Sequence, residues 1–455
     1  MKASRIAVKS SSLGRLARAE IGDRANASSA IVNSPAQIIA RYANDHHDIK
    51  RIAIELMLPE SQIPIASQAA SRRFATRLAL FYGAIFGLLG SYLPFFPVWL
   101  KAVGIEASWI GIITAVPAVT RFTVLPFVTG LAERRQSLRN AIIITAFATA
   151  LGLTVVGTQH QAVLVFVAFA ATCCLWTPMA PLTDAYALRG VSHYGLNYGP
   201  LRLWGSAAFV VGALACGLLV DVIAPEHLIW VIALVAGASA LASLGLRPID
   251  GPKKADVIER GAGALLRDPG FLAVILASAL IQGSHAAYYI FASIVWKQSG
   301  LGGLTIAGLW SLGVVAEIVL FALSPRFSRP YAVLVVIGAL SAVARWIITA
   351  QDPPLAILAA VQLVHGLSFG LTLVGTMGLL ARNVPYPLMA RGQGYLAACS
   401  GIIASSASIL SGAIYARYGQ GVYYLMAAMA LSGAVVMWLA RHRLADQPHS
   451  AASGG

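Results

Sequence analysis

Charged residues are scarce in this sequence. Of its 455 residues only 11% are charged, whereas 58% are hydrophobic, and the mean hydropathy is +0.74. Apolar runs of about 20 residues or more recur between Thr76 and Leu439, and each is long enough to cross ~30 Å of hydrocarbon as a helix. This composition excludes an ordinary soluble protein. The runs do not alternate with polar residues, which excludes the strands of a membrane barrel.

Cysteine is scarce as well. The four cysteines lie inside apolar runs and form no C-x-x-C pair, so they give no sign of a disulfide framework or a zinc site. No phosphate loop or dinucleotide fingerprint occurs, and no H-E-x-x-H or G-x-S-x-G motif stands in the right context. We therefore expect no metal, no cofactor and no enzymatic activity. A membrane enzyme remains the alternative from a different class. The cysteines are Cys173, Cys174, Cys216 and Cys399.

The net charge of +15 is distributed unevenly. If the N-terminus is cytoplasmic, the opposite face holds only Lys101, Lys297 and Arg417. This bias follows the positive-inside rule, so the basic character indicates topology rather than nucleic-acid binding. We expect a monomer in the cell inner membrane with both termini cytoplasmic, and a small-molecule substrate and the lipid bilayer as its partners. The cytoplasmic side holds Arg134, Arg135, Arg139, Arg189, Arg247, Lys253, Lys254, Arg260, Arg267, Arg326, Arg329, Arg382, Arg391, Arg441 and Arg443.

We predict an all-α membrane protein with twelve transmembrane helices in two six-helix halves. The halves are residues 74–247 and 269–441, with a polar cytoplasmic linker at 248–268 and a cytoplasmic tail at 442–455. A two-half layout is typical of secondary transporters and disfavours a channel or receptor. Because only GTQHQ separates the third and fourth spans, eleven is the alternative count. The predicted spans are 76–100, 107–130, 139–158, 162–187, 200–222, 227–246, 270–296, 303–324, 330–350, 354–381, 389–416 and 420–440.

Residues 1–73 contain no apolar run long enough to span a membrane. The opening MKASRIAVKSSSLGRLARAEI is rich in Arg and Ser, as transit peptides are. We favour a disordered tail, or a stretch upstream of the true start, since Met57 would also begin a plausible protein.

Few ionisable residues lie clearly within the spans. They are two acids, three arginines and two histidines: Asp184, Glu317, Arg121, Arg202, Arg345, His285 and His365. An ionisable group at membrane depth costs at least ~2.5–3.5 kcal/mol on insertion scales, so it persists only if it is paired, hydrated in a cavity or neutralised. Each of these residues is therefore a candidate functional residue. Arg121, near Pro117 and Pro126, is expected either to pair with an acid or to act at a gate.

Asp184 and Arg202 lie at similar depth on neighbouring helices, because each is nine residues from a turn centred near His193. We expect them to face one another as a bidentate pair. Two interpretations stay open. The pair either binds substrate in the central cavity, or it joins two helices near the cytoplasmic interface.

Glu317, Arg345 and His365 lie away from the ends of three consecutive spans and can form one cluster. Since desolvation favours the neutral form of a carboxyl group, Glu317 can exchange a proton near neutral pH. A structural pair with an arginine is the alternative. Gln282, His285 and Tyr289 stand at i, i+3 and i+7, which places them on one helix face that we expect to face a cavity. His285 alone could also be a packing residue.

Several of these stretches resemble the phenylpropionate permease family of the major facilitator superfamily. The resemblance covers residues 74–441 and rests on PLTDA, YGPLRLWGSAAFVVG, QGSHAAYYIFASIVW, LWSLGVVAEIVLFALS and VARW. The loop GLAERRQSLRN resembles the superfamily's G-x-x-x-D-R-x-G-R-R loop, with Glu133 in place of the Asp, which implies a gating or structural role for Glu133 and Arg134. The family implies proton-coupled uptake of an aromatic acid such as 3-phenylpropionate. A sugar or nucleoside symporter and an efflux pump are the alternatives.

The chain is more distantly similar to the lactose permease family of proton–sugar symporters. In that family an acid and an arginine eighteen residues apart contact substrate, which matches Asp184 and Arg202. Its eighth-helix glutamate matches Glu317, and its ninth-helix arginine and tenth-helix histidine match Arg345 and His365. The resemblance implies substrate contacts for Asp184, Arg202, Arg345 and His365. We expect His285 and Tyr289, on their cavity-facing helix face, to contact substrate as well. The family's coupling glutamate and its lysine correspond here to Ser368 and Gln362. Either Glu317 carries the proton, as we expect, or the transporter is coupled differently.

Overall fold

The computed structural model describes residues 65–135, 137–196, 198–249, 265–385 and 388–445. The contacts divide the chain into one unit that ends at Gln68 and a second that begins at Ala69 and contains the membrane helices, apart from the start of the first. Within the described residues the regular structure is helical throughout, with no strand. Helices are the structure expected of these sequences, since lipid offers no partner to backbone N–H and C=O groups.

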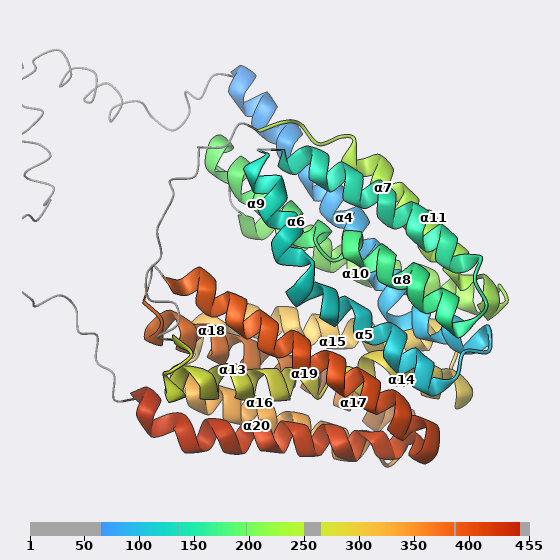
Figure 1. Cartoon of the computed structure of the whole chain (residues 1–455), viewed down its shortest axis with the longest axis vertical. Helices are drawn as coiled ribbons and strands as arrows, with labels where there is room; N and C mark the ends of the chain where they lie inside the picture. Colours follow the sequence, from blue (N-terminus) through green and yellow to red (C-terminus); the bar gives the residue numbers. More distant parts are fainter. Residues whose placement is uncertain (1–64, 136, 197, 250–264, 386–387, 446–455) are drawn as a thin grey trace, which may run out of the picture. The chain divides into compact units, whose positions relative to one another are not determined.

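The helices of the first half are coloured blue to green in Figure 1, and those of the second half yellow to red. Short 3-10 turns, Pro225–His227, Ser324–Arg326 and Gly419–Gly421, lie at helix ends. The first half comprises α4 (Ile65–Ala102), α5 (Ala107–Thr123), α6 (Leu125–Arg134), α7 (Leu138–Gly157), α8 (Ala162–Trp176), α9 (Met179–Tyr194), α10 (Tyr198–Val220) and α11 (Leu228–Ser243). The second half comprises α13 (Pro269–Gly283), α14 (Ala286–Gln298), α15 (Gly303–Leu323), α16 (Tyr331–Thr349), α17 (Leu355–His365), the π-helical segment η4 (Gly366–Leu371), α18 (Thr372–Asn383), α19 (Met389–Tyr418) and α20 (Val422–Ala445).

These helices agree with the predicted membrane spans. Within the described residues ten helical stretches are long and apolar enough to cross a membrane, or eleven if α5 and α6 form one bent span. The last stretch, Arg391–Leu444, contains both α19 and α20, which correspond to the eleventh and twelfth predicted spans. The third and fourth spans are separate, because α7 ends at Gly157 and α8 begins at Ala162.

The predicted domain boundaries differ from the helices at two places. The first helix begins at Ile65, so residues 65–73 belong to α4 rather than to the predicted tail. Phe74 is buried against Tyr186 and Tyr194 on α9. At the other end α20 continues to Ala445, beyond the predicted end of the second half at 441. Residues 1–64, 250–264 of the linker and 446–455 of the tail lie outside the described residues.

Four predicted spans are interrupted. The second bends by 47° between α5 and α6, and the fourth breaks between α8 and α9, where Pro178 and Pro181 remove backbone donors. The seventh breaks at Ser284 and His285, between α13 and α14, and the tenth passes through η4. Interrupted helices at corresponding positions of two halves indicate a binding site in a transporter, and the fourth and tenth spans correspond.

Within each half the helices pack along one another, as α7 does with α11 and α16 with α20 (Figure 1). Between the halves, α5 packs against α19 and α10 against α15. Helices α10 and α15 approach closely because glycines meet there. A Cβ atom on Gly217 would lie 2.6 Å from the carbonyl oxygen of Gly303. Larger residues would separate the two helices there.

One ion pair joins the halves at the far end, meaning the end of the bundle opposite the start of α4 and the end of α20. Asp221, just after α10, accepts hydrogen bonds from the Gly303 amide with both carboxylate oxygens, at 2.9 and 2.7 Å. It also pairs with Lys297 at 3.0 Å. The Gly303 amide first, and then Lys297, hold the pKa of Asp221 below its usual value. These contacts form what we call the far-end latch.

The far-end latch predicts that Asp221→Asn favours conformations in which the halves separate at that end. A cysteine replacing buried Ala307, which lies beside Gly217, should then react with a membrane-impermeant maleimide roughly two- to fivefold faster, since exposed ion pairs contribute little. Because the pKa of Asp221 is lowered, the latch is intact at neutral pH and is lost only as the pH falls through that lowered value.

The matched control is Asp352→Asn at an exposed far-end position whose φ of 51° suits asparagine. It should leave the labelling rate of the Ala307→Cys protein unchanged. Equal rates for the Asp221 variant and the control would show that Asp221 does not hold the halves together.

Candidate functional site

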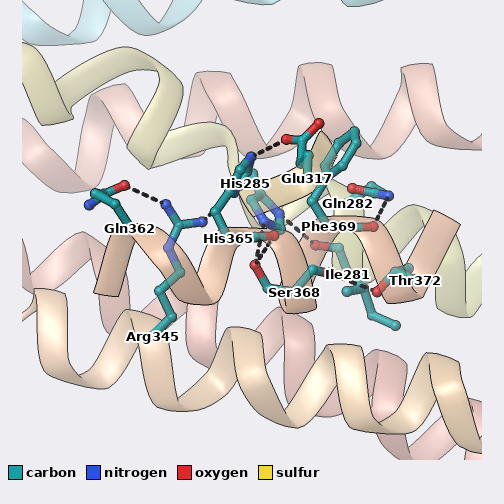
Figure 2. A network of polar contacts seen from close by, with 10 residues as sticks. All are labelled: Ile281, Gln282, His285, Glu317, Arg345, Gln362, His365, Ser368, Phe369 and Thr372. Atoms are coloured by element: carbon teal, nitrogen blue, oxygen red, sulfur yellow. Dashed lines mark hydrogen bonds and ion pairs between the residues drawn. The ribbon is translucent and has the colours of Figure 1, made fainter. Parts of the chain in front are cut away.

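A buried arginine organises the second half. Arg345 on α16 is 1% exposed, and its guanidinium makes a fork of two hydrogen bonds to α17. Nη1 lies 2.6 Å from His365 Nδ1, and Nη2 donates to Gln362 Oε1 at 2.9 Å (Figure 2). A planar guanidinium can make both bonds at once, which an ammonium group cannot do. Residues i and i+3 on α17 present the two acceptors on one face.

The same contacts fix the tautomer of His365. A guanidinium only donates hydrogen bonds, so Nδ1 of His365 accepts from Arg345 and carries no proton. The imidazole proton is therefore on Nε2, which lies 2.7 Å from Glu317 Oε1 on α15 and donates to it. His365 is neutral here and links a cation to a carboxylate. We call Glu317, His365, Arg345 and Gln362 the relay.

Two helix breaks meet beside the relay. His285 stands at the break between α13 and α14, and Ser368 lies in η4. His285 Nδ1 is 3.1 Å from the Ile281 carbonyl oxygen, an acceptor only, so Nδ1 carries the proton and Nε2 accepts. The Ser368 hydroxyl lies 3.3 Å from Nε2 and 3.3 Å from the His365 carbonyl oxygen, and its one proton is shared between these two acceptors (Figure 2). π-Helical segments inside α-helices are frequent at functional sites.

A side chain of one broken helix also contacts the backbone of the other. Gln282 Nε2 donates to the Phe369 carbonyl oxygen of η4 at 3.4 Å. In the described part of the chain, Gln282 Oε1 and Arg345 Nε are buried without a hydrogen-bond partner. Buried polar atoms of this kind are costly, and they are typical of sites where a structure holds polar groups ready for another partner.

Aromatic side chains surround the relay. The guanidinium of Arg345 lies 4.4 Å from the ring centroid of Tyr288 and 4.5 Å from that of Trp346. Tyr289 lies between Trp310 and His365, with centroid distances of 6.0 and 6.5 Å. Cation–π contacts of this kind stabilise a desolvated guanidinium by about 2 kcal/mol. These two rings therefore help to keep Arg345 charged at membrane depth.

The first half contains a second polar cluster, in which the predicted ion pair is absent. Asp184 on α9 accepts hydrogen bonds from Tyr82 at 2.6 Å and Tyr198 at 2.9 Å instead of pairing with Arg202. Arg202 places its guanidinium 3.9 Å from the ring centroid of Phe86 and 5.7 Å from that of Tyr82. The prediction of a direct bidentate pair is wrong for this structure, because Tyr82 contacts both groups.

The third embedded arginine, Arg121, lines a cavity of about 170 Å³ formed by α4, α5 and the break between α8 and α9. Phe86, Tyr92 and Trp176 form its aromatic wall. Tyr92 and Trp176 meet edge to face at 4.5 Å, and Thr120 next to Arg121 shares a hydrogen bond of 2.7 Å with Thr177. Arg121 has neither a hydrogen bond nor an acidic partner among the described residues, so the predicted pairing with an acid is not found.

The structure brings together Glu317, Arg345 and His365, as predicted, and places His285 and Tyr289 beside them. Gln362 and Ser368, which depart from the distant relatives, are members of the same network. Gln362 and Ser368 each lie three residues from His365 in the sequence, and this spacing could have predicted that they belong to the site. No sequence feature predicted Tyr82 and Tyr198 as site residues. Glu133 and Arg134 end α6, and their side chains lie outside the described residues.

Comparison with known proteins identifies similar chains. The sequence model of the MFS_1 like family matches residues 75–426. The chain is 32% identical to the "Probable 3-phenylpropionic acid transporter" of Escherichia coli (strain K12), over 78% of this chain and 94% of that protein. It is 27% identical to the maltose permease of Geobacillus stearothermophilus, over 82% of this chain and 96% of that one.

A solved structure shares the fold. The crystal structure of a mutant of the nucleoside transporter NupG superposes with a TM-score of 0.74, at 15% sequence identity, and covers 81% of this chain and 99% of that one. At this identity the likeness concerns the fold alone.

The fork at Arg345 predicts that Arg345→Lys destabilises the protein although it keeps the charge. A lysine can reach only one of the two acceptors, His365 or Gln362, and leaves the other buried without a donor. The free energy of unfolding should fall by about 1–2 kcal/mol, as for other polar contacts between membrane helices. Thermal unfolding of the purified protein in detergent measures the loss. Arg417→Lys, at an exposed position, is the matched control, and an equal effect there would contradict the fork.

Proposed function

Because the chain belongs to the MFS_1 like family, we propose that it is a secondary transporter that carries a small aryl-alkanoic acid together with a proton. The named relatives are transporters, and one of them is named for 3-phenylpropionic acid. The coupling proposal rests on the relay, in which one carboxylate and one guanidinium are joined through a neutral imidazole.

In this proposal Glu317 is the proton carrier. While Glu317 is ionised, its charge balances that of Arg345. A proton that reaches Glu317 removes this balance and leaves the relay with one net positive charge. An anionic substrate restores the balance, so the bound proton and the bound substrate each favour the other. Protonation of His365 itself requires Arg345 to withdraw, because Nδ1 cannot both accept from Arg345 and hold a proton.

The alternatives within the family concern the substrate and the direction. A neutral sugar would also suit a site of carboxylate, arginine and aromatic rings, and one relative is named maltose permease. An efflux pump shares the same architecture. We favour an acid because three arginines but only two acids lie clearly within the spans, which leaves a cation available for an anionic solute.

An enzyme is not part of this proposal. Residues 366–370 spell G-L-S-F-G, and Ser368 lies 3.3 Å from a histidine nitrogen, as a nucleophile and its base would. The hydrolase motif places its serine on an exposed turn between a strand and a helix. Here Ser368 and His285 are both 0% exposed, and Ser368 lies within a π-helical segment. The pair therefore positions the helix breaks rather than attacking a substrate.

We place the protein in the cytoplasmic membrane as a monomer with both termini in the cytoplasm, and with the proton gradient as its energy source. The support is the excess of Lys and Arg in the loops on the side of the termini. In this orientation the far-end latch faces the outside and holds the two halves together there.

Counterflow tests the transporter proposal. Proteoliposomes loaded with unlabelled 3-phenylpropionate should transiently accumulate the labelled compound from outside, because only a carrier exchanges one for the other. An excess of maltose or of a nucleoside should leave this signal unchanged. Counterflow with maltose or a nucleoside but not with 3-phenylpropionate would refute the aryl acid, and its absence with all three would refute a carrier for any of them.

The relay predicts that Glu317→Gln separates accumulation from exchange. Glutamine mimics the protonated carboxyl permanently, so the variant should lose accumulation driven by a pH gradient and keep substrate exchange. Both are measured in the same vesicles. Glu106→Gln, an exposed far-end position, is the matched control and should keep both activities. Normal pH-driven accumulation by Glu317→Gln would exclude Glu317 as the proton carrier.

A further inference from the structure

The three embedded arginines differ in what occupies their guanidinium groups. Arg345 donates to two side-chain acceptors and lies between two aromatic rings. Arg202 rests on the face of Phe86. Arg121 has no such contact in the described chain, although its side chain is exposed into a cavity. An arginine at membrane depth persists only where a partner or water satisfies it, so Arg121 is the one that is free to bind an anion.

The cavity beside Arg121 has the size and lining of an aryl site. Its volume is about 170 Å³, and a protein cavity of about 150 Å³ lined by apolar side chains binds benzene. Aromatic rings from α4 and the end of α8 form the wall, while Arg121 supplies the only charged side chain of the described lining. This lining therefore complements a ligand with one aromatic ring and one anionic group.

The position of the cavity links it to the relay. Trp176 and Thr177 lie at the break of the fourth span, the counterpart of the tenth span, whose η4 segment lies beside His365. Tyr289 of the second half, beside His365, lies near both Arg121 and Glu317. The cavity and the relay therefore border the same tyrosine.

We propose that Arg121 binds the carboxylate of the transported acid, and that the cavity bounded by Phe86, Tyr92 and Trp176 receives its aryl ring. This inference rests on the proposed function, and it replaces a gating role for Arg121 with a substrate-binding one. Arg121 then selects for the charge of the substrate, Trp176 limits the size of its ring, and Glu317 carries the proton that accompanies it.

The test compares an acid with its neutral amide. Purified wild-type protein in detergent should bind 3-phenylpropionate more tightly than 3-phenylpropionamide, as measured by isothermal titration calorimetry. Arg121→Gln should weaken binding of the acid by about 10- to 100-fold, the value of a charge-assisted hydrogen bond, and leave binding of the amide unchanged. Arg417→Gln at the exposed end of α19 should keep the full preference for the acid.

A second variant tests the ring site without removing the charge. Trp176→Ala enlarges the cavity, so it should bind 3-(2-naphthyl)propionate at least as well as 3-phenylpropionate, whereas the wild type should favour the smaller ring by tenfold or more. Arg121→Lys, which keeps a cation, should retain part of the preference for the acid. These two variants decide the question if Arg121→Gln does not fold.

The outcomes separate this inference from the proposed function. If the wild type transports and binds the acid but a folded Arg121→Gln keeps its preference over the amide, the inference is wrong and the transporter proposal stands. The inference is equally wrong if Trp176→Ala leaves the ring preference unchanged. If the wild type shows neither binding nor counterflow of the acid, the aryl-acid substrate and this inference fail together.

Discussion

The fork of hydrogen bonds from Arg345 is the contact on which the second half depends. A guanidinium at the centre of a membrane protein needs acceptors, and α17 supplies two of them, at Gln362 and His365. That requirement sets the rotation of α17 against α16 and leaves His365 with its proton on Nε2, pointing to Glu317. One buried cation thus determines a helix packing, a tautomer and the partner of a carboxylate.

Broken helices make room for these polar groups. The seventh and tenth spans would each present a continuous apolar surface if they were regular, yet they are interrupted at His285 and at Gly366–Leu371. The interruptions lie against one another, so that Ser368 contacts His285 and Gln282 donates to the Phe369 carbonyl. Each break thus supplies partners for polar groups of the other, as irregular backbone in a membrane protein requires.

The sequence predicts the number and order of the spans, because a hydrocarbon layer permits only long apolar helices. It also predicts the cluster of Glu317, Arg345 and His365, since few ionisable residues lie within spans and consecutive helices are neighbours. It fails where the geometry depends on side-chain direction. Asp184 and Arg202 lie at matching depth, but depth alone cannot reveal that Tyr82 contacts both of them. The helix breaks at His285 and in η4 contain no proline, so the sequence did not predict them.

The difference between Arg121 and Arg345 bears on how a two-half carrier couples two ligands. Arg345 donates two hydrogen bonds within its own half, so its charge is engaged in the relay and stabilises Glu317 while the relay is intact. Arg121 has no such partners in the described first half, and its charge is open to whatever enters the cavity. A site for the solute anion in one half and a site for the proton in the other can influence each other through their charges across the interface, without any direct bond between them. Separation of the halves during the cycle would then weaken that influence and release both ligands together.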